Sequence, residues 1–239
     1  MNAVLKSIVH QARVALLPAE ARAVLRDRLT YLSPEKLTRL TGAVHEVAKR
    51  GVPGDLLEFG VALGGSSVLL ARHATNERQF HGFDVFARIP EPTSAKDDAK
   101  SKERYQVIAA GESPGIGGDP YYGYRTDLYE QVCATFARYG RPVDEKRIFL
   151  HRGLFEETWP GYTRASVAFA HLDCDWYDPV RFCLNAVLPR LSPGATLILD
   201  DYHDYGGCRT AVDEFLQENS GAFAVDDGAN LRLRFTAGS

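Results

Sequence analysis

Short apolar runs alternate with helix-compatible stretches along most of this chain. The runs have the length and composition of buried strands, and they cover Asp55–Val61, Gln79–Val85, Arg147–His151, Val167–Asp173 and Ala195–Asp200. The helix-compatible stretches lie between most of them, at 66–74, 126–139, 179–190 and 208–219. Such alternation predicts an α/β fold, doubly wound, with a mostly parallel sheet covered by helices on both faces.

Both ends of the chain depart from this alternation. Residues 5–28 have the apolar spacing of two short amphipathic helices separated at Pro18, and a third helix is expected from the cap at Ser33 to a stop before Gly51. The tail, Phe223–Phe235, has two strand-like runs around a turn of Asp, Gly and Asn residues. We expect an N-terminal helical extension and an antiparallel hairpin at one edge of the sheet.

Length and composition limit the class of protein. The chain has 239 residues, 45% of them hydrophobic, which is enough for one domain over residues 1–239. A net charge of -3 gives no basic field, so nucleic acid is not an expected partner. Four cysteines lack metal-binding spacing, the first residues lack a signal peptide, and no run of about 20 apolar residues suits a membrane span. We expect reduced thiols and a cytoplasmic protein.

Two of the predicted strands end in pairs of acidic residues. Asp173 and Asp175 close one run, and Asp200 and Asp201 close another. If these runs are neighbouring parallel strands, about 4.8 Å apart, up to four carboxylates meet at one edge and repel unless they are protonated or bridged by a cation. The alternative is that the acidic residues end the strands and face water. Two pairs favour a metal site over that alternative.

A glycine-containing turn follows the first predicted strand. Glu58 and Gly60 lead into Gly64 and Ser66, where a helix pattern begins. Glycines there let a ligand approach the backbone, and a helix N-terminus offers N–H groups to an anion. The spacing is not the dinucleotide fingerprint G-x-G-x-x-G, and glycine turns are common. However, Asp84 ends the next strand, where a carboxylate can accept hydrogen bonds from ribose hydroxyls, so a nucleotide-type cofactor is expected.

Segment 87–124 is rich in proline, glycine and tyrosine and shows no helical or strand period. We expect an irregular stretch, and one of this length in a compact domain is usually mobile or functional.

Six ordered blocks of this sequence resemble the macrocin O-methyltransferase family, over roughly residues 30 to 220. The blocks are Gly51–Gly65, Gly82–Pro90, Gly153–Pro160, Leu172–Tyr177, Pro189–Gly194 and Asp200–Tyr202. The family includes metal-dependent sugar O-methyltransferases of antibiotic biosynthesis. The resemblance implies a class I, Rossmann-like fold with seven strands, S-adenosylmethionine as methyl donor, and a divalent cation, usually Mg²⁺. It also implies adenine contacts near Gly153.

The resemblance bears on the partners as well. In related enzymes an N-terminal segment covers the active site or joins a second subunit, so residues 1–50 are expected to form a lid or a dimer contact; ordinary packing helices are the alternative. Phe59, Ala62 and Leu63 differ from the family's usual residues. The resemblance implies an acceptor hydroxyl on a natural-product sugar, and these differences leave a polyketide or a phenol as alternatives.

The expected chemistry assigns roles to the acidic residues. An alcohol with a pKa of about 15 must lose its proton before methyl transfer, which a bound cation and a general base both promote. Asp200 and Asp201 are expected metal ligands together with Asp173 or Asp175; the remaining aspartate of that pair is the base, and spacing does not separate the two roles. His203 is a further candidate for the base or for orienting a ligand, or it is a loop histidine.

Two other classes share this type of fold. A nicotinamide-dependent oxidoreductase would show the tighter glycine fingerprint and has no use for clustered carboxylates. A catalytically inactive binding protein would not need the acidic cluster, which this chain has kept.

Overall fold

The computed structural model describes residues 3–236, so both ends of the expected 1–239 domain lie outside the described residues. Within them, one sheet of seven strands is found in the order β3-β2-β1-β4-β5-β7-β6. The strands are β1 (Asp55–Phe59), β2 (Phe80–Asp84), β3 (Ile148–Arg152), β4 (Val167–Leu172), β5 (Leu191–Leu199), β6 (Phe223–Asp226) and β7 (Leu231–Phe235). The first five are parallel and the last two form an antiparallel hairpin beside β5, which confirms the predicted fold class.

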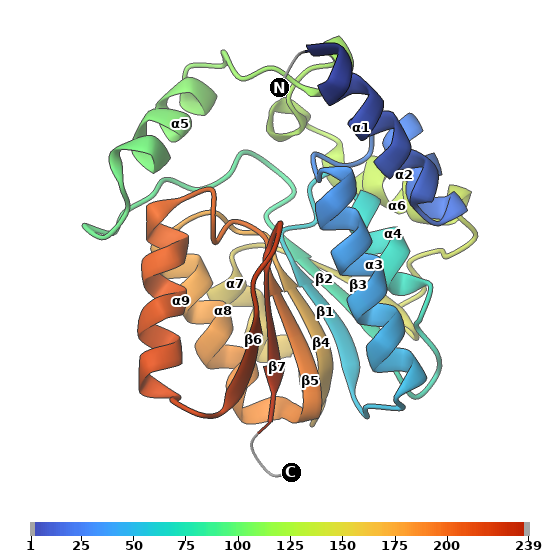
Figure 1. The fold of residues 1–239 in the computed structure, drawn as a ribbon, viewed down its shortest axis with the longest axis vertical. Helices are drawn as coiled ribbons and strands as arrows, with labels where there is room; N and C mark the ends of the chain where they lie inside the picture. Colours follow the sequence, from blue (N-terminus) through green and yellow to red (C-terminus); the bar gives the residue numbers. More distant parts are fainter. Residues whose placement is uncertain (1–2, 237–239) are drawn as a thin grey trace.

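Helices cover both faces of this sheet (Figure 1). They are α1 (Ala3–Leu16), α2 (Ala19–Arg26), α3 (Pro34–Lys49), α4 (Gly65–Ala71), α5 (Ala99–Ala109), α6 (Leu128–Arg138), α7 (Phe155–Thr158), α8 (Tyr177–Val187) and α9 (Gly206–Glu218). α3, α4 and α6 lie on one side of the sheet, and α7, α8 and α9 lie on the other. No helix in residues 3–236 is long and apolar enough to cross a membrane.

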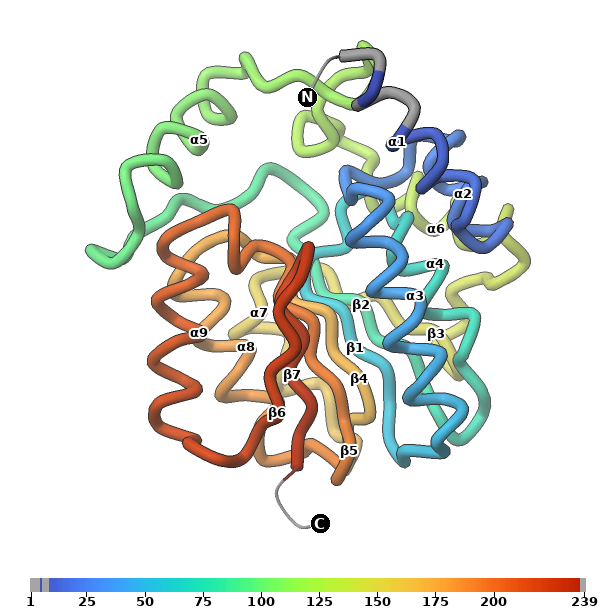
Figure 2. The backbone as a smooth tube through the Cα atoms, viewed as in Figure 1, coloured from blue at the N-terminus to red at the C-terminus, as the bar shows by residue number. Residues whose placement is uncertain are grey.

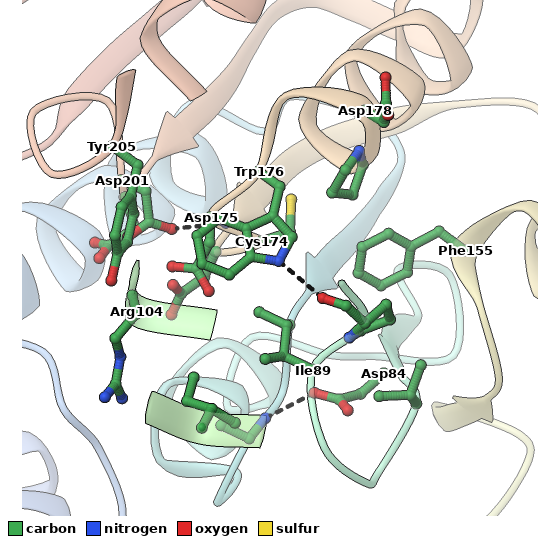
Figure 3. A pocket seen from close by; sticks show the side chains of 18 of the residues that line it. Asp84, Ile89, Arg104, Phe155, Cys174, Asp175, Trp176, Asp178, Asp201 and Tyr205 are labelled. Atoms are coloured by element: carbon green, nitrogen blue, oxygen red, sulfur yellow. Dashed lines mark hydrogen bonds between the residues drawn. The ribbon is translucent and has the colours of Figure 1, made fainter. Parts of the chain in front are cut away.

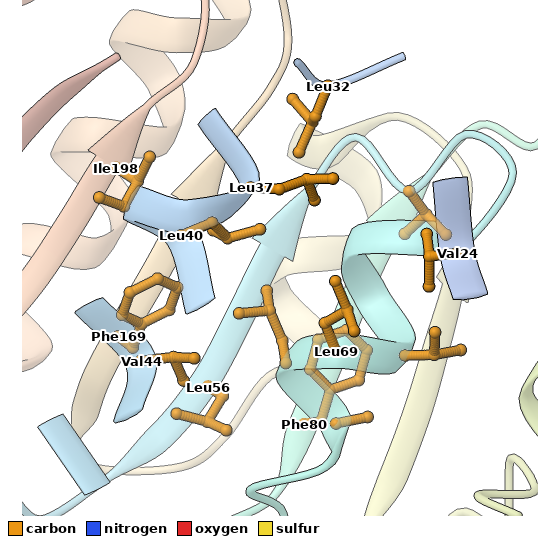
Figure 4. Packing of buried hydrophobic residues seen from close by; sticks show 14 of the residues in the cluster. Val24, Leu32, Leu37, Leu40, Val44, Leu56, Leu69, Phe80, Phe169 and Ile198 are labelled. Atoms are coloured by element: carbon orange, nitrogen blue, oxygen red, sulfur yellow. The ribbon is translucent and has the colours of Figure 1, made fainter. Parts of the chain in front are cut away.

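Two hydrophobic clusters lie on opposite faces of the sheet, and alternating side chains of the central strands belong to one or the other. Leu56 of β1 points to the α3 side, in the cluster that also contains Phe169 of β4 and Ile198 of β5 (Figure 4). Its neighbour Leu57 belongs to the cluster on the α8 side with Leu197. This period of two is what a sheet covered on both faces requires.

The order of the strands reverses between β1 and β4. β1 leads through the chain to β2 and β3 on one side, whereas β4 leads to β5 on the other. In open α/β sheets, ligands bind outside the carboxyl ends of the strands at such a reversal. Gly60 and Asp173 follow β1 and β4 at this point, and they touch so closely that a Cβ at Gly60 would overlap the Asp173 carbonyl.

The N-terminal helices belong to the packed body of the protein. The chain is interrupted at Pro18, as expected, and Ser33 caps α3 by accepting a hydrogen bond from the N–H of Lys36. Val24 and Leu37 are buried in the α3-side cluster, whereas Leu16 at the end of α1 is 85% exposed.

One expectation was wrong in part. Segment 87–124 contains α5, which sequence period could not indicate because only Ser101 and Ile108 of its residues are buried. Asp98 caps this helix, and that residue was the available signal. Figure 2 follows the chain from β2 out to α5, beside α9, and back to α6.

Candidate active site

A cavity of about 790 Å³ opens at the carboxyl ends of β1, β2, β4 and β5. Its lining includes Gly60 and Asp84 from the ends of β1 and β2, and the acidic residues that follow β4 and β5. Tyr31 and Leu32, ahead of α3, complete one wall. The cavity therefore lies at the reversal of strand order.

Strand register brings the two acidic pairs together. Leu172 of β4 lies opposite Leu199 of β5, so the residues that follow them are neighbours, and the N–H of Asp200 donates to the Leu172 carbonyl at 2.9 Å. Carboxylate oxygens of Asp173, Asp200 and Asp201 all lie within 4.8 Å of one another.

Asp175 borders this cluster without being part of it. Its backbone adopts a left-handed conformation, with φ of 57°, where the chain turns from β4 towards α8. Its N–H donates to Asp201 Oδ2 at 3.2 Å, and its side chain lines the cavity beside Tyr205 and Arg104 (Figure 3). Residue spacing did not distinguish the roles of Asp173 and Asp175. In the structure Asp173 belongs to the group of three carboxylates, and Asp175 lies beside it.

Burial and mutual repulsion make these carboxylates hard to ionise together. Burial and the charges of neighbouring aspartates raise the pKa of Asp173 and of Asp175 well above the ordinary value, and they raise the pKa of Asp201 to about 6. Burial acts in the same direction on Asp200, but the facing His171 and Lys36 outweigh it and lower its pKa. The cluster therefore has a deficit of positive charge.

Lys36 is a site residue that the sequence did not reveal. Its ammonium bonds to Asp200 Oδ2 at 2.7 Å and to Asp204 Oδ2 at 2.7 Å. Burial disfavours the charged amine, yet the Asp200 carboxylate outweighs this and raises the pKa of Lys36. Because Lys36 is 164 residues from Asp200 in the chain, no local sequence motif could predict the contact.

His171 lies beneath the cluster and is completely buried. Its Nδ1 is 2.8 Å from Glu58 Oε1, whereas its Nε2 has no hydrogen-bond partner among the described residues and lies 3.8 Å from Asp200 Oδ1. Burial lowers the pKa of His171, but the two carboxylates outweigh burial and raise it to about 10.

Asp84 holds together the turn at which the methyl donor was expected to bind. Its Oδ2 accepts from the N–H groups of Val61 and Ala62 at 2.8 and 2.9 Å, and its Oδ1 accepts from Phe86 N–H at 2.6 Å. Burial raises the pKa of Asp84. This carboxylate holds the turn after β1 in shape and also lines the cavity.

Four predicted cofactor residues lie outside the cavity lining. Glu58 is fully buried and bonds to Ser67 and His171. Gly64 caps α4 with φ of 83°, and Ser66 is buried in that helix. Gly153 donates its N–H to the Asp84 carbonyl at 3.0 Å. Gly64 and Gly153 belong to turns near the cavity, Glu58 to β1 and Ser66 to α4, whereas Gly60 and Asp84 border the cavity directly.

His203 stands apart from the other candidates. It does not line the cavity, and its Nε2 lies 2.8 Å from Asp227 Oδ1 at the surface. Conversely, Leu154 and Phe155 line the cavity next to Gly153, although neither was a predicted site residue. An apolar pair directly after a predicted contact residue was the available signal.

Known proteins resemble this chain in sequence and in fold. The model of the macrocin O-methyltransferase (TylF) family matches residues 13–113 and 125–225. The 8-demethyl-8-(2,3-dimethoxy-alpha-L-rhamnosyl)-tetracenomycin-C 4'-O-methyltransferase of Streptomyces olivaceus is 34% identical over 216 residues, 88% of this chain and 77% of that protein. The mycinamicin III 3''-O-methyltransferase of Micromonospora griseorubida is 30% identical over 190 residues, 78% of this chain and 69% of that protein.

A solved O-methyltransferase structure has the same fold as this chain. The O-methyltransferase NovP superimposes with a TM-score of 0.71 at 24% identity, over 87% of this chain and 82% of that chain. Because the family model matches most of the chain and two relatives are at least 30% identical over more than two thirds of it, the chain belongs to the macrocin O-methyltransferase family and is an O-methyltransferase.

Proposed function

We propose that this enzyme transfers the methyl group of S-adenosylmethionine to a hydroxyl of a natural-product sugar, with a divalent cation, Mg²⁺, at the acidic cluster. The observation that carries the proposal is the group of oxygens from Asp173, Asp200 and Asp201 at the reversal of strand order. The sugar is supported by the two relatives, whose names specify a rhamnosyl-tetracenomycin and mycinamicin III as substrates.

The residues present suit a hard cation. All three clustered groups are carboxylates, the oxygen donors that Mg²⁺ prefers, and the cavity leaves room for water ligands. Lys36 and the buried His171 compensate the repulsion among them only in part, because the pKa values of Asp173 and Asp201 stay raised. A bound cation would supply the missing positive charge and lower the pKa of a coordinated acceptor hydroxyl.

Asp175 is the proposed general base, because it lines the cavity beside the cluster. Burial and the Asp201 charge raise its pKa, and a stronger base accepts a proton from an alcohol more readily. His203 is not used in this scheme, since it lies outside the cavity lining.

The methyl donor is proposed to lie along the opposite half of the cavity. The turn from Gly60 to Ala62 would face its aminocarboxylate, Asp84 its ribose, and Leu154 and Phe155 its adenine. Two structures with the same type of fold contain this donor or its product, by their descriptions. Sulfur and acceptor oxygen would then meet near Asp173, between the two halves.

The N-terminal segment is proposed to wall the site, because Tyr31, Leu32 and Lys36 line the cavity. The exposed Leu16 leaves room for the expected contact of a homodimer or higher homo-oligomer. The free state of all four cysteines agrees with the cytoplasm as the proposed location.

Calorimetry and turnover together test this function. S-adenosylhomocysteine should bind and NAD should not. In a panel of glycosides with free sugar hydroxyls, one product should gain a single methyl group in the presence of Mg²⁺, and excess chelator should abolish this gain reversibly. Full turnover in excess chelator would refute the metal site, and methylation of phenols alone would refute the sugar acceptor.

A further inference from the structure

The ammonium group of Lys36 uses all of its hydrogen-bond donors at one side of Asp200. Its ammonium contacts Asp200 Oδ2 at 2.7 Å, the Asp200 main-chain oxygen at 3.0 Å and Asp204 Oδ2 at 2.7 Å, so its three N–H groups have three acceptors. Lys36 stands in the first turn of α3, where the helix dipole disfavours a positive charge. The carboxylates therefore offset an unfavourable position for a lysine.

The other oxygen of Asp200, Oδ1, faces the completely buried Asn230, while His171 Nε2 lies farther from it, at 3.8 Å. Asn230 Nδ2 donates to Asp200 Oδ1 over a long 3.4 Å, and its own Oδ1 accepts from Arg39 Nε at 3.1 Å. Arg39 also donates to the main-chain oxygen of Asp226 at 2.8 Å, and a side chain at Gly228 would overlap its guanidinium. The turn between β6 and β7 is thus docked on α3 and carries Asn230 to the acidic cluster.

We propose that Lys36, Arg39 and Asn230 form an Asp200 clamp, in which Lys36 and Asn230 are positioning residues for the metal ligand and Arg39 acts through Asn230. The inference rests on the proposed metal-dependent function. Three carboxylates within 4.8 Å repel, and a single restraint would let Asp200 rotate away from its neighbours. Holding both oxygens orients the carboxylate, and each oxygen keeps a lone pair for a cation.

The same helix and hairpin offer a matched control. Arg232 of β7 bonds to Glu46 of α3 at 2.6 Å, and neither residue lines the cavity. Replacing Arg232 loosens the junction of α3 with the hairpin without releasing Asp200.

The test compares Asn230→Leu, Arg39→Met and Arg232→Met with the wild type in Mn²⁺ titrations followed by electron paramagnetic resonance. Partners that orient metal ligands typically change metal affinity or activity about 10–100-fold. Asn230→Leu should weaken Mn²⁺ binding to about this extent and lower kcat, while the Kd for S-adenosylhomocysteine stays unchanged. Arg39→Met should weaken Mn²⁺ binding less.

Whether Arg39→Met weakens or tightens Mn²⁺ binding shows whether Arg39 acts by positioning Asn230 or by its charge. Removing a positive charge near the cluster would by itself tighten cation binding, so weaker binding requires the contact through Asn230. Arg232→Met should lower the melting temperature without changing the Kd for Mn²⁺.

Mn²⁺ affinities of Asn230→Leu and Arg39→Met within about twofold of the wild type would overturn the clamp, as would an equal loss in Arg232→Met. If Asn230→Leu does not fold, Arg39→Met decides, because its side chain is 24% exposed. A wild-type protein that binds no Mn²⁺ would instead refute the proposed metal site, and the clamp with it.

Discussion

The carboxylate of Asp98 accepts a hydrogen bond from the N–H of Gly206 at 2.9 Å, which joins the segment before α5 to the first residue of α9. Asp98 also caps α5 by accepting from Ser101 N–H at 2.8 Å. Its neighbour Asp97 accepts from the N–H of Tyr177, the first residue of α8, at 2.8 Å. Two adjacent carboxylates therefore anchor α5, whose residues Lys100, Arg104 and Ile108 line the cavity.

Replacing Asp98 with Ala should loosen this anchor. Loss of a helix cap costs about 0.5–2 kcal/mol, so urea unfolding at pH 7 should show a decrease in that range, and the amides of α5 should exchange faster with solvent. Burial opposes ionisation of Asp98, but the bonds from Ser101 and Gly206 lower its pKa, so the effect should persist above about pH 4 and vanish as the pH falls through the folded pKa. Unchanged α5 exchange would contradict the anchor.

Asn substitutions should separate the ligand from the base. Asp173→Asn should lose both Mn²⁺ binding and turnover, because it removes charge from the clustered oxygens. Asp175→Asn should keep Mn²⁺ binding and lose about 10²–10⁴-fold in kcat, the range for general base catalysis. Titration and steady-state kinetics measure both quantities. Equal Mn²⁺ affinities with equal losses of kcat would remove the distinction between these two aspartates.

Lys36→Met should destabilise the protein in the absence of metal. The side chains of Lys36 and Asp200 are 16% and 4% exposed, and removing one partner of such a pair costs about 3–5 kcal/mol because a buried charge is left uncompensated. Urea unfolding should show this loss, with a smaller one for Lys36→Arg. Mg²⁺ should restore part of the stability by supplying positive charge. A loss below about 1 kcal/mol, typical of exposed pairs, would disagree with this account.

Asp84→Asn should weaken donor binding while leaving Mn²⁺ binding intact. Asn keeps one acceptor oxygen for the turn at Val61 and Ala62 but removes the charge offered to ribose hydroxyls. Hydrogen bonds to charged groups are worth about 1.5–3 kcal/mol, so the Kd for S-adenosylhomocysteine should rise at least tenfold in calorimetry. An unchanged Kd would show that the donor lies elsewhere in the cavity.

Stabilisation by Mg²⁺ should depend on pH. Burial and Asp200 raise the pKa of Asp201 to about 6, above the unfolded value of about 3.9, so this group stabilises the metal-free fold at low pH and ceases to do so as the pH rises through about 6. Mg²⁺ competes with that proton. The gain in melting temperature should therefore be larger at about pH 7.5 than at about pH 5, and small in Asp201→Asn at both. Equal gains for the wild type at both pH values would exclude this competition.

The sequence by itself determined the strands and the residues at their ends. Short apolar runs indicate strands that are buried on both faces. Acidic residues directly after two of these runs must lie at the edge of the sheet formed by the carboxyl ends of the parallel strands. Asp173, Asp200 and Asp201 were therefore predictable as neighbours. The family resemblance supplied the methyl donor, which no spacing of residues specifies, and the identity of the cation that the acidic pairs had already suggested.

Tertiary structure alone decided what surrounds those residues. Lys36 and Asn230 reach Asp200 from helix α3 and from the β6–β7 turn, far apart in the chain, and such contacts depend on how elements dock. Glu58 faces His171 instead of the cavity because β1 and β4 pair these two residues directly. α5 was missed because it buries almost no apolar face, and its place is set by the bonds of Asp97 and Asp98 to the first residues of α8 and α9, which form only in the folded chain.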